Sequence, residues 1–201
     1  MTFKSINPAD GNTFAEIDTF TSEQLESVLQ ESAFAAPRWR ELALAERCRL
    51  MRNAGQVLEA RAEEFARLIT FEMGKPIREA RAEVQKCTWV CEFYAAEGPG
   101  FLDDEVIESD AGRSLVAWQP LGTVLAIMPW NFPFWQVFRF AAPALIAGNT
   151  GLLKHASNVP RCAQAIETVF REAGFPAGVF RSLMIPSSRV AAVIDLSLIH
   201  I

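Results

Sequence analysis

Two features of the 201-residue sequence predict an α/β protein in which amphipathic helices precede a parallel sheet. In the first half of the chain, apolar side chains recur every three or four positions, with Arg and Glu between them. From Gly122 onward, short apolar runs alternate with helical segments, as expected of parallel strands joined by right-handed crossovers. Half of the residues are hydrophobic, so the chain can bury a sizeable core.

The first predicted helix begins at a capping box, because Thr21 is followed three residues later by Gln24, and it is expected to end at Pro37. Apolar stripes predict further helices around residues 50–58, 65–69 and 77–87. The run Gly74-Lys75-Pro76 interrupts them, and the helical pattern stops at Glu97-Gly98-Pro99-Gly100. We assign residues 1–105 to this helical part.

The second half of the chain predicts strands. Ser114 to Gln119 is typical of an exposed strand, which another subunit could cover, and we assign residues 106–120 to an arm. The continuous apolar run Val124 to Met128 favours a strand buried on both faces. The elements expected after it are a helix at 135–147, a strand at 150–153, a helix at 160–173 and a strand at 179–185. Residues 121–195 are therefore expected to form a Rossmann-like βαβαβ core.

Composition and charge exclude several classes of protein. The net charge of −5, with both signs interspersed, argues against binding to nucleic acid. Residues 1–12 lack the apolar run of a secretory signal, so we expect a cytoplasmic protein. The most apolar region, residues 132–147, is too short and too often interrupted to cross a membrane. The four cysteines lack the spacing of metal ligands, so no metal site is expected and the thiols should be buried and reduced.

Two loops at the carboxyl ends of the first two core strands are candidates for a ligand site, because parallel sheets bind ligands there. The first is Pro129-Trp130-Asn131-Phe132-Pro133, and the second is Lys154-His155-Ala156-Ser157-Asn158. Neither is a glycine-rich phosphate loop. The residues alone leave structural roles open: Trp130 as a packed corner, Asn131 as a helix cap, Lys154 as a surface lysine.

The motifs in these loops resemble the cofactor-binding core of the aldehyde dehydrogenases. The segments that carry the resemblance are 121–124 with 129–133, Pro143-Ala144-Leu145, Gly148-Asn149-Thr150 and Lys154, and earlier Asn7-Pro8-Ala9-Asp10-Gly11 and Glu72-Met73-Gly74-Lys75-Pro76. The likeness extends from the N-terminus to about Asp195. It implies a dinucleotide-binding domain, a catalytic domain and an oligomerisation arm, of which this chain has the first and part of the third, in a homo-oligomeric parent that acts on a small-molecule aldehyde.

The resemblance also implies roles for individual residues, with NAD or NADP as cofactor. The backbone of Ile127, Met128, Pro129 and Trp130 is expected along the dinucleotide, and Lys154 should bond a ribose hydroxyl, with His155, Ala156 and Ser157 beside it. His155 is expected to line the crevice through its backbone rather than act as an acid or base. The amide of Asn131 should point at the aldehyde oxygen, where a rigid neutral donor stabilises the oxyanion that forms.

Three further positions, Phe132, Gln136 and Arg139, correspond to the aldehyde channel of the family. A buried arginine would be costly unless paired, and its guanidinium suits a carboxylate at the far end of a substrate. Succinate semialdehyde dehydrogenases have an arginine at this position, so that aldehyde is the expected substrate. The alternative is that Arg139 reaches solvent or pairs with a carboxylate of the protein.

The residue at position 157 predicts the cofactor preference. Many NAD-preferring members have a glutamate there, whose charge repels a 2′-phosphate. Ser157 leaves room for the phosphate, and His155 could assist if protonated, so we expect both NAD and NADP to be accepted.

Some of the family pattern is missing from the chain. The catalytic cysteine and glutamate of the family lie downstream, so we expect a fragment that is inactive by itself. Residues 196–201 do not continue into the expected strand, and a common transposase sequencing adapter encodes the same six residues in one frame, which suggests a non-native tail. Gly151 also departs from the pattern, which usually has a larger apolar residue there.

Three hypotheses of function follow from the sequence. The first is a fragment of an aldehyde dehydrogenase that works through a cysteine thiohemiacetal and hydride transfer. The second is a dinucleotide-binding module without activity. The third is a reductase of the same superfamily that acts on acyl phosphates or acyl-CoA, against which the motif Trp130-Asn131-Phe132-Pro133 argues.

Overall fold

The computed structural model describes residues 1–196 and 199–200 of the chain. Its elements, in chain order, are β1 (Thr2–Ile6), β2 (Thr13–Asp18), α1 (Ser22–Glu41), α2 (Leu44–Ala60), α3 (Ala62–Met73), α4 (Ile77–Phe101), β3 (Glu105–Ile107), β4 (Ser114–Val116), β5 (Thr123–Met128), α5 (Trp135–Ile146), β6 (Thr150–His155), α6 (Pro160–Glu172), β7 (Phe180–Ser182), the 3₁₀ turn η1 (Ser187–Arg189), α7 (Val190–Ile194) and β8 (Ile199–His200).

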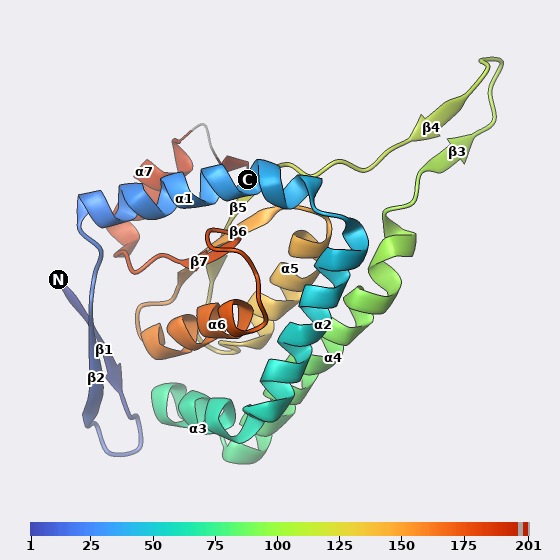
Figure 1. Ribbon diagram of the computed structural model, residues 1–201. Coiled ribbons are helices and arrows are strands. Elements are labelled where there is room, and N and C mark those ends of the chain that lie inside the picture. Colours follow the sequence, from blue (N-terminus) through green and yellow to red (C-terminus); the bar gives the residue numbers. More distant parts are fainter. Residues whose placement is uncertain (197–198, 201) are drawn as a thin grey trace.

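A parallel sheet in the order β7-β6-β5-β8 forms the centre of the fold (Figure 1). β5 and β6 pair in register from Thr123 opposite Thr150 to Met128 opposite His155. The helix α5 connects β5 to β6, and α6 connects β6 to β7. The predicted α/β class, with helices followed by a Rossmann-like parallel core, is therefore confirmed.

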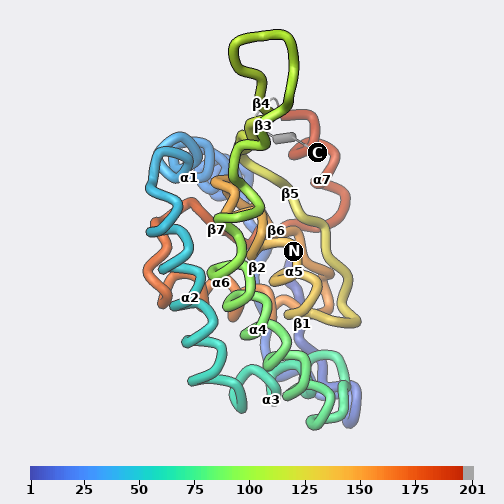
Figure 2. The backbone as a smooth tube through the Cα atoms, turned by 90° about the vertical axis from the view of Figure 1, so that its right-hand side faces the viewer, coloured from blue at the N-terminus to red at the C-terminus, as the bar shows by residue number. Residues whose placement is uncertain are grey.

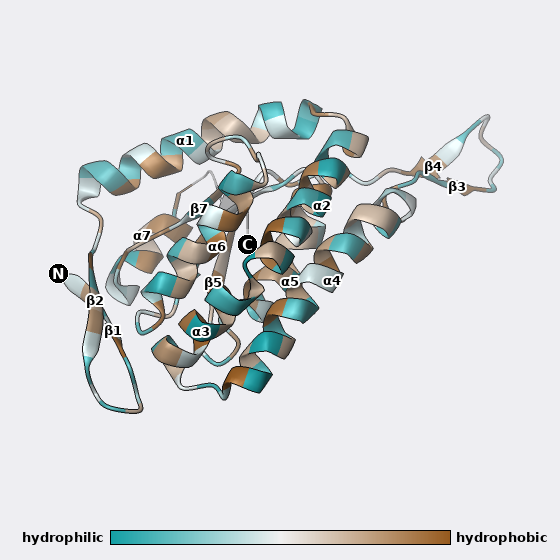
Figure 3. Ribbon diagram, turned by 60° about the horizontal axis from the view of Figure 1, so that its bottom comes forward, coloured by the Kyte–Doolittle hydropathy of each residue, from teal (hydrophilic) through white to brown (hydrophobic). Residues whose placement is uncertain are grey.

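Two adjacent leucines of β6 show how the helices cover the sheet. Leu152 packs in a cluster with Leu25 and Leu29 of α1, whereas Leu153 belongs to the main core with residues of α2 to α6. Successive side chains of a strand point to opposite faces, so α1 covers one face and α5 and α6 cover the other (Figure 1). The helices α2, α3 and α4 pack on the outside of α5 and α6, and polar and apolar residues alternate along them (Figure 3).

The helix α1 has the predicted capping box at Thr21 and Gln24, but it continues past Pro37 to Glu41. The predicted end at Pro37 is therefore wrong. Proline removes one helical hydrogen bond, and packing beyond it compensates. Trp39 is buried, and its indole Nε1–H donates to the carbonyl oxygen of Leu145 at 2.9 Å.

The helix α4 likewise runs through the predicted stop at Glu97–Gly100 and ends at Phe101. Gly98 is buried against α5, where a Cβ atom would lie 2.9 Å from Cγ2 of Ile146. A glycine that signals a helix end in the sequence thus serves the close contact of two helices in the structure.

Two antiparallel hairpins lie outside the sheet. β1 and β2 form an N-terminal hairpin that the sequence analysis did not foresee, and β3 and β4 form a second hairpin that projects from the body (Figures 1 and 2). The predicted exposed strand at residues 114–119 is confirmed in its first three residues, which form β4. The β3–β4 hairpin exposes large apolar side chains, among them Val106 and Val116.

The strands of the sheet differ in length from the predicted ones. β6 extends to His155, so Lys154 and His155 end a strand instead of starting a loop, and β7 comprises Phe180–Ser182 alone. Ile127 of β5 is exposed, so this strand is not buried on both faces as predicted. At Gly151, a Cβ atom would lie 3.1 Å from the ring of Phe180, which fills the space of the larger residue expected there.

The strand β8 pairs with β5 in parallel, with Ile199 opposite Thr123. This strand was not predicted, because a short segment can pair with the edge of a sheet through its backbone N–H and C=O groups, which leave no pattern in the sequence. Residues 197, 198 and 201 of the predicted non-native tail lie outside the described residues, and the origin of the tail stays a prediction. Within the described ranges, every helix is too short or too polar to cross a membrane.

Candidate functional site

A cleft of about 420 Å³ lies at the carboxyl ends of β5 and β6. Most of the residues predicted to bind the cofactor line it: Ile127, Met128, Pro129, Lys154, His155, Ala156 and Ser157. The parallel register explains why they meet, because Ile127 pairs with Lys154 and Met128 with His155. Two segments more than twenty residues apart thus form one site, at the edge of the sheet where parallel folds bind ligands.

Lys154 is a buried lysine at this site, with 4% of its surface exposed. Its ammonium group donates a hydrogen bond to the backbone carbonyl of His155. Burial lowers the pKa of Lys154 below its usual value, since a charged group loses solvation there. The alternative of a solvated surface lysine is therefore wrong.

His155 links the two site loops, which we call the β5 loop (129–134) and the β6 loop (156–159). Its Nδ1 accepts the N–H of Ala156 at 2.9 Å, and its Nε2 lies 2.9 Å from the carbonyl oxygen of Pro133. With Nδ1 as acceptor, the proton belongs on Nε2, which donates to Pro133. Burial lowers the pKa of His155 to about 4, which disfavours at neutral pH the protonated form that could assist with a phosphate.

Trp130 and Asn131 stand apart from this cleft. Both side chains are exposed on the β5 loop, and neither belongs to the cleft lining. Asn131 does not cap α5, since the N-cap residue is Phe134 and no side chain of the N-cap bonds the helix.

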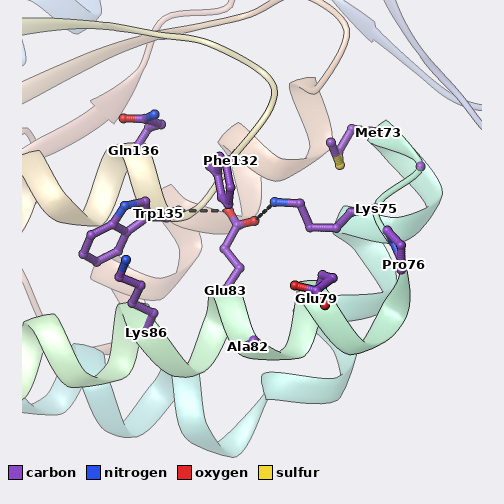
Figure 4. A pocket seen from close by; sticks show the side chains of 11 residues that line it. Met73, Lys75, Pro76, Glu79, Ala82, Glu83, Lys86, Phe132, Trp135 and Gln136 are labelled. Carbon is purple, nitrogen blue, oxygen red and sulfur yellow. Dashed lines mark hydrogen bonds and ion pairs between the residues drawn. The ribbon is translucent and has the colours of Figure 1, made fainter.

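A larger pocket, of about 620 Å³, lies between α4 and the start of α5 (Figure 4). It contains two of the three predicted substrate residues, Phe132 and Gln136. The other lining residues are Met73, Gly74, Lys75, Pro76, Glu79, Ala82, Glu83, Lys86 and Trp135. Residues from the helical part of the chain and from the β5 loop therefore line the same pocket.

Four charged side chains surround this mainly apolar pocket. Lys75 and Glu83 form a buried ion pair, and the Lys75 ammonium lies 3.7 Å from the centre of the Phe132 ring. Lys86 extends along the ring of Trp135, with its ammonium 4.0 Å from the ring centre. The fourth is Glu79 at the rim.

Arg139 lies outside the lining of this pocket. It is exposed on the face of α5 opposite the buried Val137 and Phe138, and its guanidinium donates to the amide oxygen of Gln136 at 3.0 Å. The expectation that Arg139 is buried is therefore wrong in this chain, because helical periodicity places it one turn from Gln136 on the solvent side.

The four cysteines are buried in helices α2, α4 and α6. Burial raises the pKa of all four thiols, Cys48, Cys87, Cys91 and Cys162, above the usual value. A thiol with a raised pKa is a poor nucleophile, because the thiolate is the reactive form. None of these cysteines is suited to attack an aldehyde.

Several residues of these two sites were not predicted from the sequence. Ser187 of η1 lines the smaller cleft, and Lys75, Glu83 and Lys86 line the larger pocket. The spacing of Glu83 and Lys86 on one helix places them on neighbouring positions of its surface. No signal in the sequence identifies Ser187, because only the chain reversal after β7 brings it to the cleft.

Known proteins resemble the chain closely in sequence. A probable NADP+-dependent succinate-semialdehyde dehydrogenase of Synechocystis sp. is 51% identical over 185 residues, which are 92% of this chain and 41% of that protein. A succinate semialdehyde dehydrogenase of Escherichia coli K12, described as NAD(P)+-dependent, is 46% identical over 198 residues, covering 94% of this chain and 43% of that protein.

The fold is also similar to solved structures. A succinic semialdehyde dehydrogenase from Streptococcus pyogenes, crystallised with NADP+ as the cofactor, matches with a TM-score of 0.95 at 33% identity, over 98% of this chain and 44% of that one. The chain thus spans less than half the length of these relatives. The model of the aldehyde dehydrogenase family matches residues 1–195, and the chain belongs to this family.

Proposed function

We propose that the protein to which this chain belongs oxidises succinate semialdehyde to succinate with NAD+ or NADP+, and that these residues bind the dinucleotide and orient the aldehyde. The proposal rests on one observation: residues 127–129 and 154–157 line a single cleft at the carboxyl ends of β5 and β6. The likeness to relatives named for this reaction supports the choice of substrate.

The chemistry of the cleft fits a dinucleotide. Its polar groups are the buried ammonium of Lys154, the exposed hydroxyl of Ser157 and the neighbouring Asn158 and Ser187, and Ile127 and Met128 add apolar surface for a ring. Lys154 would hold a ribose hydroxyl, and the neutral Ser157 leaves room for a 2′-phosphate. A bound nicotinamide would accept a hydride from the substrate.

In this proposal Asn131 contributes to catalysis directly. Its side chain is exposed on the β5 loop, between the cofactor cleft and the larger pocket in sequence, and a neutral amide donor can stabilise an oxyanion without a change in protonation. Phe132 and Gln136 would line the path of the aldehyde, since both face the larger pocket.

Two cations favour a substrate that carries a carboxylate. Lys86 faces the larger pocket beside Trp135, and Arg139 is held by Gln136, which lines the same pocket. An aldehyde that enters with its carboxylate toward Arg139 would gain a charge-assisted hydrogen bond.

We further infer that these 201 residues by themselves do not oxidise aldehydes, and that the parent protein is a homo-oligomer. All four thiols of the chain are buried with raised pKa values, which leaves the aldehyde without a nucleophile from this chain. The exposed apolar side chains of the β3–β4 hairpin support a role of this arm in subunit contact.

The substrate can be tested in the full-length enzyme by following NAD(P)H formation with succinate semialdehyde and with butanal, an uncharged aldehyde of equal length. We expect the change Arg139→Leu to raise KM for succinate semialdehyde about tenfold more than KM for butanal, the equivalent of one charge-assisted hydrogen bond of about 1.4 kcal/mol. Arg171→Leu is the matched control, because Arg171 is an exposed arginine of α6 that makes the same kind of contact three positions back, to Thr168, with no partner in the pocket lining, and it should change neither constant.

Equal effects of Arg139→Leu on both aldehydes would remove the argument for a carboxylate substrate. An enzyme that oxidises neither aldehyde but reduces an acyl phosphate or acyl-CoA would instead favour the reductase hypothesis.

A further inference from the structure

Glu83 is a buried carboxylate that connects the helical part of the chain to the β5 loop. One of its oxygens, Oε1, accepts the backbone N–H groups of Phe134 at 2.9 Å and Trp135 at 3.0 Å. The other oxygen, Oε2, is paired with the ammonium of Lys75. The side chain of Glu83 is 2% exposed, so both oxygens are satisfied by the protein.

These hydrogen bonds replace a missing helix cap. The first N–H groups of a helix have no partner within the helix, and the N-cap residue of α5, Phe134, offers no side-chain acceptor. Glu83 supplies the acceptor from another helix, 51 positions earlier in the chain. A negative charge at this position also favours the positive end of the α5 dipole.

Lys75 holds the same loop from a second side. Its ammonium lies 3.7 Å from the centre of the Phe132 ring, an attractive arrangement of a cation and an aromatic face. Figure 4 shows the side chains of Lys75 and Glu83 pointing toward each other, with Phe132 directly above their contact. The pair therefore fixes the loop at the ring of Phe132 and at the backbone of Phe134 and Trp135.

Asn131 immediately precedes these fixed points and is exposed, so its own packing does little to orient it. Between these fixed points, the carbonyl of Pro133 is bonded to His155. The orientation of the Asn131 amide thus depends on contacts that its neighbours make. A displacement of about 1 Å at a catalytic group can lower a rate about 100-fold.

We propose that Glu83, neutralised by Lys75, is a positioning residue that holds the β5 loop so that the Asn131 amide faces the reacting aldehyde. This role rests on the proposed function, in which Asn131 stabilises the oxyanion. Glu83 and Lys75 touch the loop and not the substrate, so neither is a catalytic residue.

The test is a double-mutant cycle in the full-length enzyme that combines Glu83→Gln with Asn131→Ala and measures kcat. If Glu83 acts through Asn131, Glu83→Gln lowers kcat about 10-fold to 100-fold in the wild-type background but less than about twofold in the Asn131→Ala background. A purely structural role lowers kcat by the same factor in both backgrounds, and that outcome overturns the proposal.

A second variant covers the case in which Glu83→Gln fails to fold. In the paired replacement of Lys75→Met with Glu83→Gln, neither charge is left buried alone, which is the main cause of misfolding when such a pair is broken. The glutamine oxygen can still cap α5, while the cation on Phe132 is lost. The paired replacement should show the same dependence on Asn131, and equal losses of kcat with and without Asn131 overturn the proposal here as well.

The cycle also separates this proposal from the function on which it rests. A wild-type enzyme without aldehyde oxidation, or an Asn131→Ala variant with unchanged kcat, contradicts the proposed function. An active enzyme in which Asn131→Ala lowers kcat but the Glu83 effect is independent of it contradicts the positioning role alone.

Discussion

The β5 loop and the β6 loop are anchored in similar ways, but by different kinds of partner. Each loop leads into a helix whose first N–H groups are bonded by a buried glutamate from the helical part of the chain: Glu83 for α5 and Glu72 for α6. Glu83 is paired with the cation of Lys75. Glu72 instead accepts the hydroxyl of Ser5 and the N–H groups of Arg161 and Cys162, which are neutral donors.

The comparison shows what the helical part of the chain does for the site. The two glutamates stand on either side of the Gly74-Lys75-Pro76 break, where the left-handed backbone of Gly74 ends α3 before α4 begins. One break in the helices thus directs two carboxylates toward two different loops. The helices of residues 22–101 do not simply cover the sheet, because they also hold the two loops that follow β5 and β6.

The difference between the two anchors can be measured as free energy of unfolding. We expect Glu83→Gln to destabilise the 201-residue chain by about 3–5 kcal/mol, because it leaves the buried ammonium of Lys75 without a counter-charge. Glu72→Gln should lower the free energy of unfolding by about 1–3 kcal/mol, because it weakens hydrogen bonds to a charged acceptor but leaves no buried cation without a counter-charge. Urea unfolding, followed by tryptophan fluorescence, gives both values.

The matched control is Glu59→Gln, which makes the same change at an exposed position near the end of α2 and should alter stability by less than about 0.5 kcal/mol. Equal losses for Glu72→Gln and Glu83→Gln would contradict the distinction between a neutral and an ionic anchor.

The sequence predicted the kinds of elements better than their ends. Helical stripes and apolar runs identified the helices α1 to α6 and the strands β4 to β7, since periodicity reports which face is buried. Pro37 and Pro99 were misleading because tertiary packing outweighed the loss of one hydrogen bond at each of them.

The candidate site was predicted where sequence neighbours share a loop and missed where distant segments meet. Lys154 lies at the end of β6 and Ser157 shortly after it, so a local motif identified both, and the parallel register places Lys154 beside Ile127. The contact of Glu83 with the backbone of Phe134 is invisible in the sequence, because a backbone N–H carries no residue signature.

The β6 loop also offers a test of cofactor choice, because Ser157 is an exposed polar residue of this loop that lines the cleft. In the full-length enzyme, Ser157→Glu should lower kcat/KM for NADP relative to NAD by about 30-fold, the equivalent of about 2 kcal/mol of repulsion between a carboxylate and a 2′-phosphate. The wild-type enzyme should accept both cofactors. Initial rates at varied NAD and NADP give the ratio.

Ser188→Glu serves as the control for this change, because Ser188 is also exposed but does not line the cleft. If Ser157→Glu leaves the ratio unmoved, or if the wild type already rejects NADP by several orders of magnitude, Ser157 does not set the preference.

His155 joins the two loops, and its imidazole makes their connection sensitive to pH. The pKa of His155 is lowered from its usual 6.5 to about 4 by burial, so the folded chain binds fewer protons than the unfolded chain between these values. Stability from this group is fully present above about pH 6.5 and is lost as the pH falls toward 4. Protonation would place an N–H at Nδ1, where the N–H of Ala156 already points.

We therefore expect His155 to lower the free energy of unfolding by about 2 kcal/mol between pH 7 and pH 5. In this range the unfolded chain binds a proton at His155 and the folded chain does not. Urea unfolding of the 201-residue chain at both pH values gives the total change, to which carboxylates also contribute. His155→Gln keeps a donor for Pro133 and an acceptor for Ala156 but does not titrate, so the difference between wild type and variant isolates the imidazole. If both proteins lose the same stability at pH 5, the bridge between the two loops does not depend on a neutral His155, and the two anchoring glutamates hold the loops without it.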